Sequence, residues 1–291
     1  MLKVKNLTKR YGKKTALNNL SLEIKKGSVF GLLGVNGAGK TTLLSILNGL
    51  MDFDEGEVTI DGVSLKNEKR KVKSFSSIIP QHLAFYENLS VEENLEFFAS
   101  IQKATKENYE KAIEVNSLGK LLKQKASTLS GGQKRRLNIA IGLLNNPKII
   151  YFDEPTVGVD PKSRNEILDS IKEYKKLGIT VVYTSHYMSE IERICDEVAI
   201  VSEGRVVEQD TLENLLSNKV SDKVMVESVF NEKLSTLGLK LLDETTVETT
   251  QEKLFEVLKL LEKNEIALKQ IRYGSTNLEK HFLEITGESS V

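Results

Sequence analysis

Cysteine is almost missing from this chain, and tryptophan is missing altogether. The one cysteine, Cys195, cannot form a disulfide within the chain, which excludes a disulfide-stabilised secreted scaffold. It ends the segment Met188–Cys195, whose pattern is typical of a helix. We therefore expect a packed thiol in a protein that works in a reducing compartment.

Long hydrophobic runs and an excess of charge of one sign are also missing. No apolar stretch approaches the roughly 18 residues of a membrane span, and Met1–Lys5 has no apolar signal region. The sequence thus predicts a soluble protein that needs a separate chain for any role in a membrane. Because 41 acidic residues balance 41 basic ones, nucleic acid is disfavoured as the main ligand.

What the sequence does contain is a glycine-rich loop between an apolar strand and a helix. The run Val29–Leu33 leads into Gly34–Thr41, which has the pattern G-x-x-x-x-G-K-T, and Thr42–Leu47 continues as a helix. Glycines let backbone N–H groups approach an anion, and the helix N-terminus adds partial positive charge. Lys40 is expected to reach the β- and γ-phosphates of a nucleotide, and Thr41 to ligate magnesium. The predicted nucleotide-binding residues of the loop are Asn36, Gly37, Ala38, Gly39, Lys40, Thr41 and Thr42.

Further polar side chains stand where apolar strands end. Asp153 and Glu154 follow one such strand, Gln81 follows another, and His186 ends a third. In a parallel sheet these ends meet at one edge, where ligands bind. Asp153 is then placed to hold magnesium, and Glu154 to take a proton from an attacking water. The plainer alternatives are a turn cap before Pro155 for the two carboxylates and purely structural roles for the glutamine and the histidine.

Two further segments begin helices. Leu129–Gln133 reads Leu-Ser-Gly-Gly-Gln before an amphipathic stretch, and Asp160 with Pro161 opens another helix. The bare N–H groups after Ser130 form a second candidate anion site, although a plain helix cap explains the serine when it is taken alone. Tyr11 is strand filler when taken alone, but beside a phosphate-binding loop an exposed ring can stack on adenine.

The order of these elements predicts an α/β fold of the P-loop NTPase type, with a mostly parallel sheet and flanking helices over residues 1–215. Residues 1–33 alternate as an antiparallel β subdomain, and helical periodicity marks a helical subdomain at about 85–145. Residues 220–287 are predicted to form a small α/β accessory domain. Its helix, 252–263, is expected to turn four apolar residues inward, namely Leu254, Phe255, Leu258 and Leu261.

Taken together, these motifs resemble the ATP-binding cassette family, the motor subunits of ABC transporters. Leu129–Gln133 matches the pentapeptide signature of that family, and the order and spacing of the other motifs agree over residues 1–212. The resemblance implies ATP and Mg²⁺ as cofactors, with the ion held by Thr41, Gln81 and Asp153. It implies catalytic roles for Glu154, His186 and Gln81, adenine stacking by Tyr11, and a D-loop at Asp160.

The resemblance also implies partners. Two cassettes of such proteins meet head to tail, so Ser130, Gly131, Gly132 and Gln133 of one chain complete the ATP site of a second copy or of a paired cassette. A membrane permease is the second expected partner, with the cassette in the cytoplasm on the inner face of the membrane. The exporter branch is indicated by Lys134–Leu143, by Asp153–Pro161 and by the closing segment Leu278–Gly287, although Lys280-His281 stands where Asp-Val is common.

Two alternatives share the same motifs. An importer ATPase has every catalytic motif and differs in the closing segment. A soluble cassette protein acting on ribosomes or DNA is disfavoured, because such relatives fuse two cassettes or insert long coiled coils, and this chain has neither.

Overall fold

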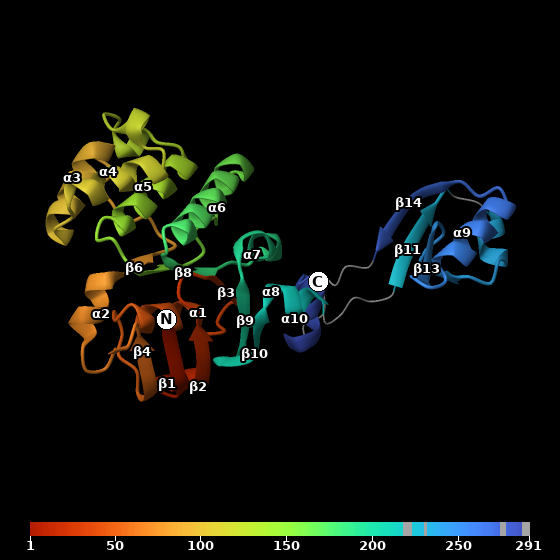
Figure 1. Ribbon diagram of the computed structural model, residues 1–291, viewed down its shortest axis with the longest axis horizontal. Coiled ribbons are helices and arrows are strands. Elements are labelled where there is room, and N and C mark those ends of the chain that lie inside the picture. The colour runs from red at the N-terminus through yellow and green to blue at the C-terminus, as the bar shows by residue number, and fades with distance from the viewer. Residues whose placement is uncertain (218–222, 230–231, 274–277, 287–291) are drawn as a thin grey trace. The chain divides into compact units, whose positions relative to one another are not determined.

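The computed structural model describes residues 1–217, 223–229, 232–273 and 278–286 and divides into two units, 1–212 and 213–291 (Figure 1). The division falls close to the boundary expected at residue 215. Gly287, the last residue of the closing segment, lies outside the described residues, as do 220–222 of the expected accessory domain. Within the described residues, none of the helices combines the length and the apolar character that crossing a bilayer requires.

A six-stranded sheet with the order β10-β9-β3-β8-β7-β6 forms the centre of the first unit. All its pairings are parallel except that of β10 with β9. Three neighbouring strands, β3, β8 and β7, are buried along their whole length, in keeping with their largely apolar sequences. The strands are β3 (Val29–Leu33), β6 (Ser76–Ile79), β7 (Ile149–Phe152), β8 (Thr180–Thr184), β9 (Glu197–Ser202) and β10 (Arg205–Thr211).

An antiparallel sheet with the order β2-β1-β4-β5 is the second layer of this unit. Helix α1 (Lys40–Leu47) buries Leu43, Leu44 and Ile46 in one hydrophobic core that this sheet shares with the central sheet. Helix α2 (Lys69–Phe75) buries Val72 and exposes Arg70, Lys71 and Lys73, as expected of a solvated face. The strands are β1 (Leu2–Tyr11), β2 (Lys14–Ile24), β4 (Glu55–Ile60) and β5 (Val63–Ser64).

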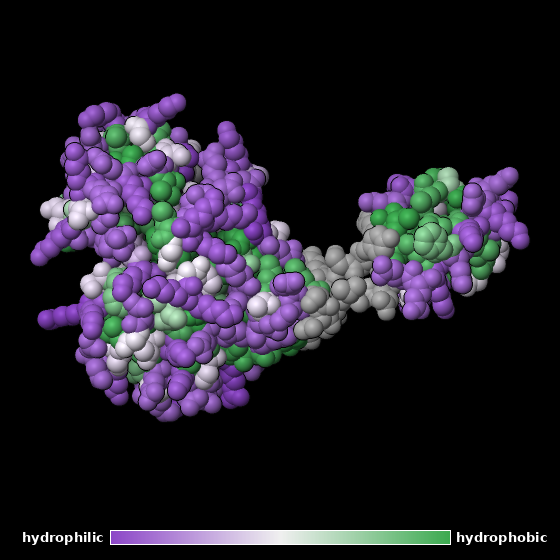
Figure 2. Space-filling view, in the orientation of Figure 1, coloured by the Kyte–Doolittle hydropathy of each residue, from purple (hydrophilic) through white to green (hydrophobic). Residues whose placement is uncertain are grey.

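Four longer helices lie together on one side of the central sheet (Figure 1). They are α3 (Val91–Gln102), α4 (Lys106–Val115), α5 (Gly131–Leu143) and α6 (Pro161–Lys176), with the 3₁₀ turns η1 (Gly119–Leu121) and η2 (Ala126–Thr128) between α4 and α5. The first three occupy the segment where helical periodicity was expected. A shorter helix, α7 (Met188–Ile194), packs with Cys195 against Gly31 of β3, so the thiol is buried. The visible face of this unit is mainly hydrophilic (Figure 2).

The second unit has an antiparallel sheet with the order β12-β13-β11-β14. Helix α9 (Leu254–Lys263) buries Leu254, Val257 and Leu261 in the core of this unit. Helix α8 (Leu212–Ser217) spans the division between the units. The remaining described elements of the second unit are β11 (Lys223–Ser228), η3 (Glu232–Thr236), β12 (Lys240–Leu241), β13 (Thr246–Thr250), β14 (Leu268–Tyr273) and α10 (Leu278–Thr286).

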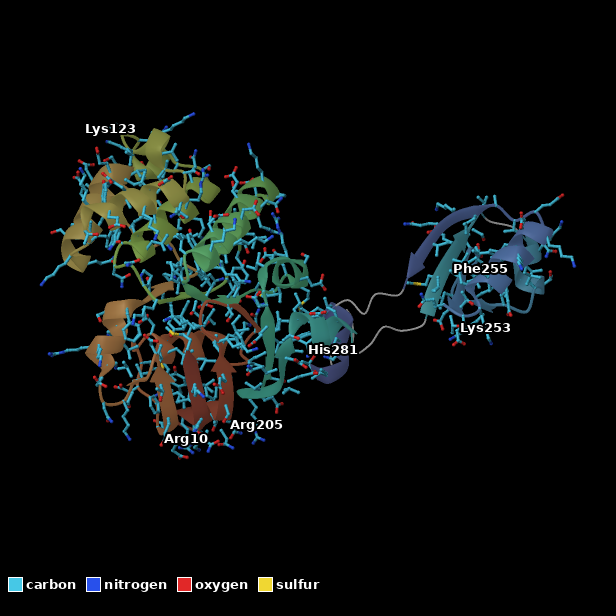
Figure 3. The ribbon with its side chains drawn as sticks, viewed as in Figure 1. Arg10, Lys123, Arg205, Lys253, Phe255 and His281 are labelled. Atoms are coloured by element: carbon cyan, nitrogen blue, oxygen red, sulfur yellow. The ribbon has the colours of Figure 1, made fainter. Side chains whose placement is uncertain are left out.

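One expected core residue of this helix is wrong. Phe255, labelled in Figure 3, is 74% exposed. Val257 takes the inward position instead. The buried positions follow the spacing i, i+3, i+7 from Leu254, whereas Phe255 is rotated about 100° from Leu254 around the helix axis. The large apolar side chain suggested the wrong face.

Tyr151 of β7 is fully buried, and its hydroxyl has no hydrogen-bond partner among the described residues. Burial also raises its pKa. Leaving a buried polar group unpaired costs about 1–3 kcal/mol, so Tyr151→Phe should stabilise the first unit by about 1 kcal/mol. The thermal midpoint measured by calorimetry should rise by roughly 2–4 °C.

Tyr174 offers the matched control for that substitution. It is equally buried, but its hydroxyl donates to Asn116 Oδ1 at 2.8 Å. Tyr174→Phe leaves that oxygen unpaired and should lower the midpoint. Equal shifts of the same sign in both variants would contradict the role given to the Tyr151 hydroxyl.

Candidate functional site

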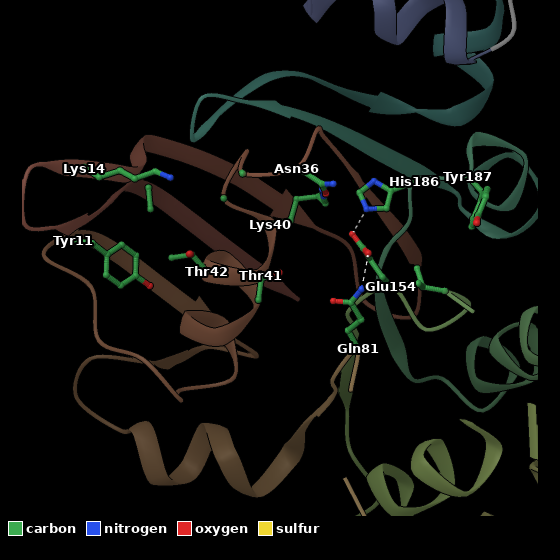
Figure 4. A pocket seen from close by; sticks show the side chains of 14 residues that line it. Tyr11, Lys14, Asn36, Lys40, Thr41, Thr42, Gln81, Glu154, His186 and Tyr187 are labelled. Carbon is green, nitrogen blue, oxygen red and sulfur yellow. Dashed lines mark hydrogen bonds and ion pairs between the residues drawn. The ribbon is translucent and has the colours of Figure 1, made fainter. Parts of the chain in front are cut away.

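A cavity of about 780 Å³ opens at the carboxyl edge of the central sheet (Figure 4). The loop after β3 and the ends of β6, β7 and β8 all reach it, so residues far apart in the sequence share one wall. Most of the predicted nucleotide and catalytic residues line it. The lining residues are Tyr11, Lys14, Ala16, Asn36, Gly37, Gly39, Lys40, Thr41, Thr42, Gln81, Glu154, Val157, His186 and Tyr187.

The glycine loop has the backbone geometry of an anion-binding turn. Gly39 has φ 105° and caps α1, and a Cβ at this position would lie 2.6 Å from the carbonyl oxygen of Ala16. Glycine is therefore required there by both conformation and space. No side chain caps α1, so its first N–H groups are available to an anion in the cavity.

Lys40 is the buried cation of this loop. Its ammonium donates to the carbonyl oxygens of Gly34 at 2.6 Å and of Val35 at 3.1 Å. Burial lowers the pKa of Lys40, while the charges of Glu154 and Asp153 oppose that effect. An anionic phosphate in the cavity would relieve the desolvation of this charge, which is the physical basis for binding there.

Glu154 is the centre of the polar cluster at the strand ends. One of its carboxylate oxygens lies 2.5 Å from His186 Nε2, and the other accepts a hydrogen bond from Gln81 Nε2 at 3.3 Å (Figure 4). Its backbone has the strained φ of 49°, and its N–H donates to Thr184 Oγ1 at 2.9 Å. The carboxylate, the imidazole and the amide follow the ends of three different strands, β7, β8 and β6, yet they meet at one point on the cavity wall.

Two predicted site residues lie behind the wall instead of on it. Asp153 is buried, and its Oδ1 accepts a hydrogen bond from Thr184 Oγ1 at 3.1 Å. Ala38 is also buried, and its side chain belongs to the core shared with α1.

The signature segment does not line this cavity. Ser130 caps α5 in a reciprocal pair, because its Oγ accepts from the N–H of Gln133 at 3.3 Å and its own N–H donates to Gln133 Oε1 at 2.9 Å. A Cβ at Gly132 would lie 2.2 Å from the Ser163 side chain, so this glycine lets α5 pack against α6.

Asp160 is likewise outside the cavity, where it caps α6. Its Oδ1 accepts from the N–H of Ser163 at 3.0 Å, and this hydrogen bond lowers the pKa of Asp160.

Four residues that line the cavity were not predicted from the sequence. Lys14 pairs with Tyr11 across the β1–β2 hairpin, and Tyr187 directly follows His186. Their positions beside predicted residues were a usable signal. Ala16 and Val157 carry no chemical signal, since small apolar residues occur throughout the chain.

A family model for ABC transporters matches residues 17–157. The chain is 36% identical to the linearmycin resistance ATP-binding protein LnrL of Bacillus subtilis (strain 168), over 99% of both chains. The chain belongs to the ABC transporter family. This ABC protein is also 32% identical to the Nod factor export ATP-binding protein I of Ralstonia nicotianae, over 99% of this chain and 94% of that one.

A solved cassette resembles the first unit. The dimeric post-hydrolysis state of the ATP-binding cassette MJ0796, bound to ADP and Pi, aligns with a TM-score of 0.65 at 28% identity. It covers 73% of this chain and 99% of the cassette. The protein is therefore the ATP-binding, ATP-hydrolysing subunit of an ABC transporter, a family whose ATP-binding subunits work with membrane permeases and dimerise.

Proposed function

We propose that two copies of this ABC protein close around two ATP molecules, hydrolyse them in the cavity described above, and thereby drive export through a separate permease. The observation that carries the proposal is the convergence of Lys40, Glu154 and His186 on one cavity wall. A phosphate-seeking cation and a proton acceptor on one wall are what phosphoryl transfer to water requires.

Within the cavity we assign one task to each group. Tyr11 is 46% exposed and can stack on adenine, while the loop N–H groups and Lys40 hold the phosphates. Glu154 takes the proton of the attacking water, and His186 and Gln81 fix its carboxylate by the contacts given above.

Two of the three residues expected to hold a magnesium ion, Thr41 and Gln81, line the cavity, whereas Asp153 is buried behind its wall. Among the described residues there is no cluster of three His, Cys, Asp or Glu able to hold a metal. Mg²⁺ is commonly held by one or two carboxylates together with substrate phosphates. Thr41, Gln81 and Asp153 would supply the hydroxyl, amide and carboxylate oxygens. When bound, the ion neutralises charge on the β- and γ-phosphates.

A dimer is supported by the presence of two candidate anion sites, of which only one lines the cavity. The chain has two helix starts with phosphate-binding character, at Gly39 and Ser130, but the second does not line the cavity. In a head-to-tail dimer Ser130, Gly131, Gly132 and Gln133 of one copy would face the γ-phosphate on the other, with Asp160 nearby. A paired second ABC subunit is the alternative partner.

Export is supported by the relative named for Nod factor export, which matches this chain over nearly its whole length, second unit included. We place the protein in the cytoplasm, on the inner face of the membrane. An importer would use the same ATPase cycle. Transport measured in inverted vesicles that hold both subunits distinguishes the two, because accumulation inside them indicates export.

The composite site is tested by Ser130→Arg. The bulky cation should block the γ-phosphate site of the partner, so hydrolysis should be lost while each chain still binds ATP on its own loop. Mixing this variant with Lys40→Ala creates dimers with one intact loop facing one intact signature. Phosphate release should return in the mixture if one site is sufficient.

Ser90→Arg is the matched control, because Ser90 caps α3 with the same reciprocal pair but has no expected nucleotide contact. Its ATPase rate should stay near that of the unmodified chain. A rate that is first order in protein at all concentrations, with no dimer by light scattering, would exclude the composite site.

A further inference from the structure

A buried carboxylate outside the cavity carries a contact network that the proposed mechanism does not use. Glu190 on α7 is 2% exposed. Its Oε1 lies 3.4 Å from Arg164 Nε. Its Oε2 accepts three hydroxyl hydrogen bonds, from Ser185 at 2.6 Å, Tyr183 at 2.8 Å and Thr156 at 2.9 Å. Burying a charge is costly unless the charge is paired and hydrogen-bonded. The concentration of three donors on one carboxylate oxygen therefore requires an explanation.

Two of those donors stand next to the catalytic pair. Thr156 lies two residues after Glu154, on the loop that leaves β7, and Ser185 directly precedes His186, on the loop that leaves β8. Ser185 Oγ also accepts from the N–H of Tyr187 at 2.9 Å, which closes the turn around His186. A single oxygen atom of Glu190 thus ties together the two loops that carry the carboxylate and the imidazole.

The other oxygen extends the network to the cavity wall. Arg164, which pairs with Oε1, also lies over the ring of Tyr187 at 4.3 Å from its centroid, and Tyr187 lines the cavity. Both oxygens of the buried carboxylate therefore contact side chains that lie next to residues of the reaction site.

We infer that Glu190 is a positioning residue for ATP hydrolysis, which sets the distance between Glu154 and His186 by holding both of their loops. This inference rests on the proposed function. The hydrogen bonds and the ion pair given above connect Glu190 to neither the nucleotide-binding loop nor Tyr11, so we expect it to act on the chemical step and not on ATP binding. Small misplacements of catalytic groups cost up to about 100-fold in rate.

The test is Glu190→Gln, which keeps the shape of the side chain but removes the charge and the ion pair with Arg164. We expect kcat for ATP hydrolysis to fall roughly 10- to 100-fold, while KM for ATP changes less than about twofold. Glu197→Gln is the matched control, because Glu197 is also a buried carboxylate, paired with Lys25 away from the cavity. That variant should keep the kcat of the unmodified chain.

Repeating Glu190→Gln in a His186→Ala background distinguishes a positioning role from a merely structural one. A residue that acts through His186 should lose most of its effect there, to less than about threefold, whereas a structural effect multiplies unchanged. An equal fold loss in both backgrounds, or a change in KM alone, would overturn the inference.

If Glu190→Gln fails to fold, Thr156→Val tests the same positioning role. It deletes one donor and leaves the charge and the ion pair in place. Its kcat should fall at constant KM, and an unchanged kcat refutes the inference. No ATPase in the unmodified chain would instead refute the proposed function, so the two failures are distinguishable.

Discussion

Glu154→Gln should lower the ATPase rate about 10²- to 10⁴-fold and leave ATP binding intact, because a positioned general base contributes about that much. The amide fills the same space beside His186 and Gln81, but it cannot take a proton from water. ATP should then stay bound between two copies, so ATP-dependent dimers should accumulate. Phosphate release, calorimetry and light scattering measure the three effects.

A surface glutamate provides the control for this result. Glu173 on α6 is exposed, pairs with Lys176 at 2.7 Å and is not among the residues that line the cavity. Glu173→Gln should hydrolyse ATP at the unmodified rate. Full turnover by Glu154→Gln would remove this carboxylate from the mechanism and with it the proton acceptor of the proposed cycle.

Lys40→Ala should lose ATP affinity as well as turnover. The variant deletes the buried ammonium that now donates to the carbonyl oxygens of Gly34 and Val35 and that faces the cavity. Hydrogen bonds to charged groups contribute about 1.5–3 kcal/mol, so affinity for ATP should fall roughly 10- to 100-fold by calorimetry. Hydrolysis should fall further, since the same charge compensates the γ-phosphate during transfer.

The control for Lys40→Ala is Lys69→Ala, which removes a lysine of α2 that pairs with Asp52 at the surface. Its ATP affinity should match that of the unmodified chain. If Lys40→Ala bound and hydrolysed ATP normally, the assignment of Gly34–Thr41 as the phosphate-binding loop would be wrong.

Lys40 and Glu154 show what local sequence patterns can predict about the site. Lys40 was identified from a contiguous motif, and Glu154 from an apolar strand that ends in a carboxylate. Both signals are short, because a glycine turn and a strand end are set by neighbouring residues. The meeting of Gln81, Glu154 and His186 was also expected, since the carboxyl ends of parallel strands share one edge.

Glu190 shows where such patterns fail. Its partners lie on β8, on the loops after β7 and β8, and on α6, and no spacing in the sequence indicates that one oxygen joins them. Before folding, this glutamate resembles any charged residue on a short amphipathic helix.

The sequence by itself determined the phosphate-binding loop, the family signature and the strand ends that carry the polar side chains. Only the tertiary structure decided that Ser130 lies outside the cavity, that Asp153 and Ala38 lie behind its wall, and that Phe255 faces outward. The physical reason is the distance along the sequence over which the deciding interactions act. Backbone turns and helix starts depend on adjacent residues, whereas the face that a side chain turns toward depends on what packs against it, and in this chain those partners come from distant strands and helices.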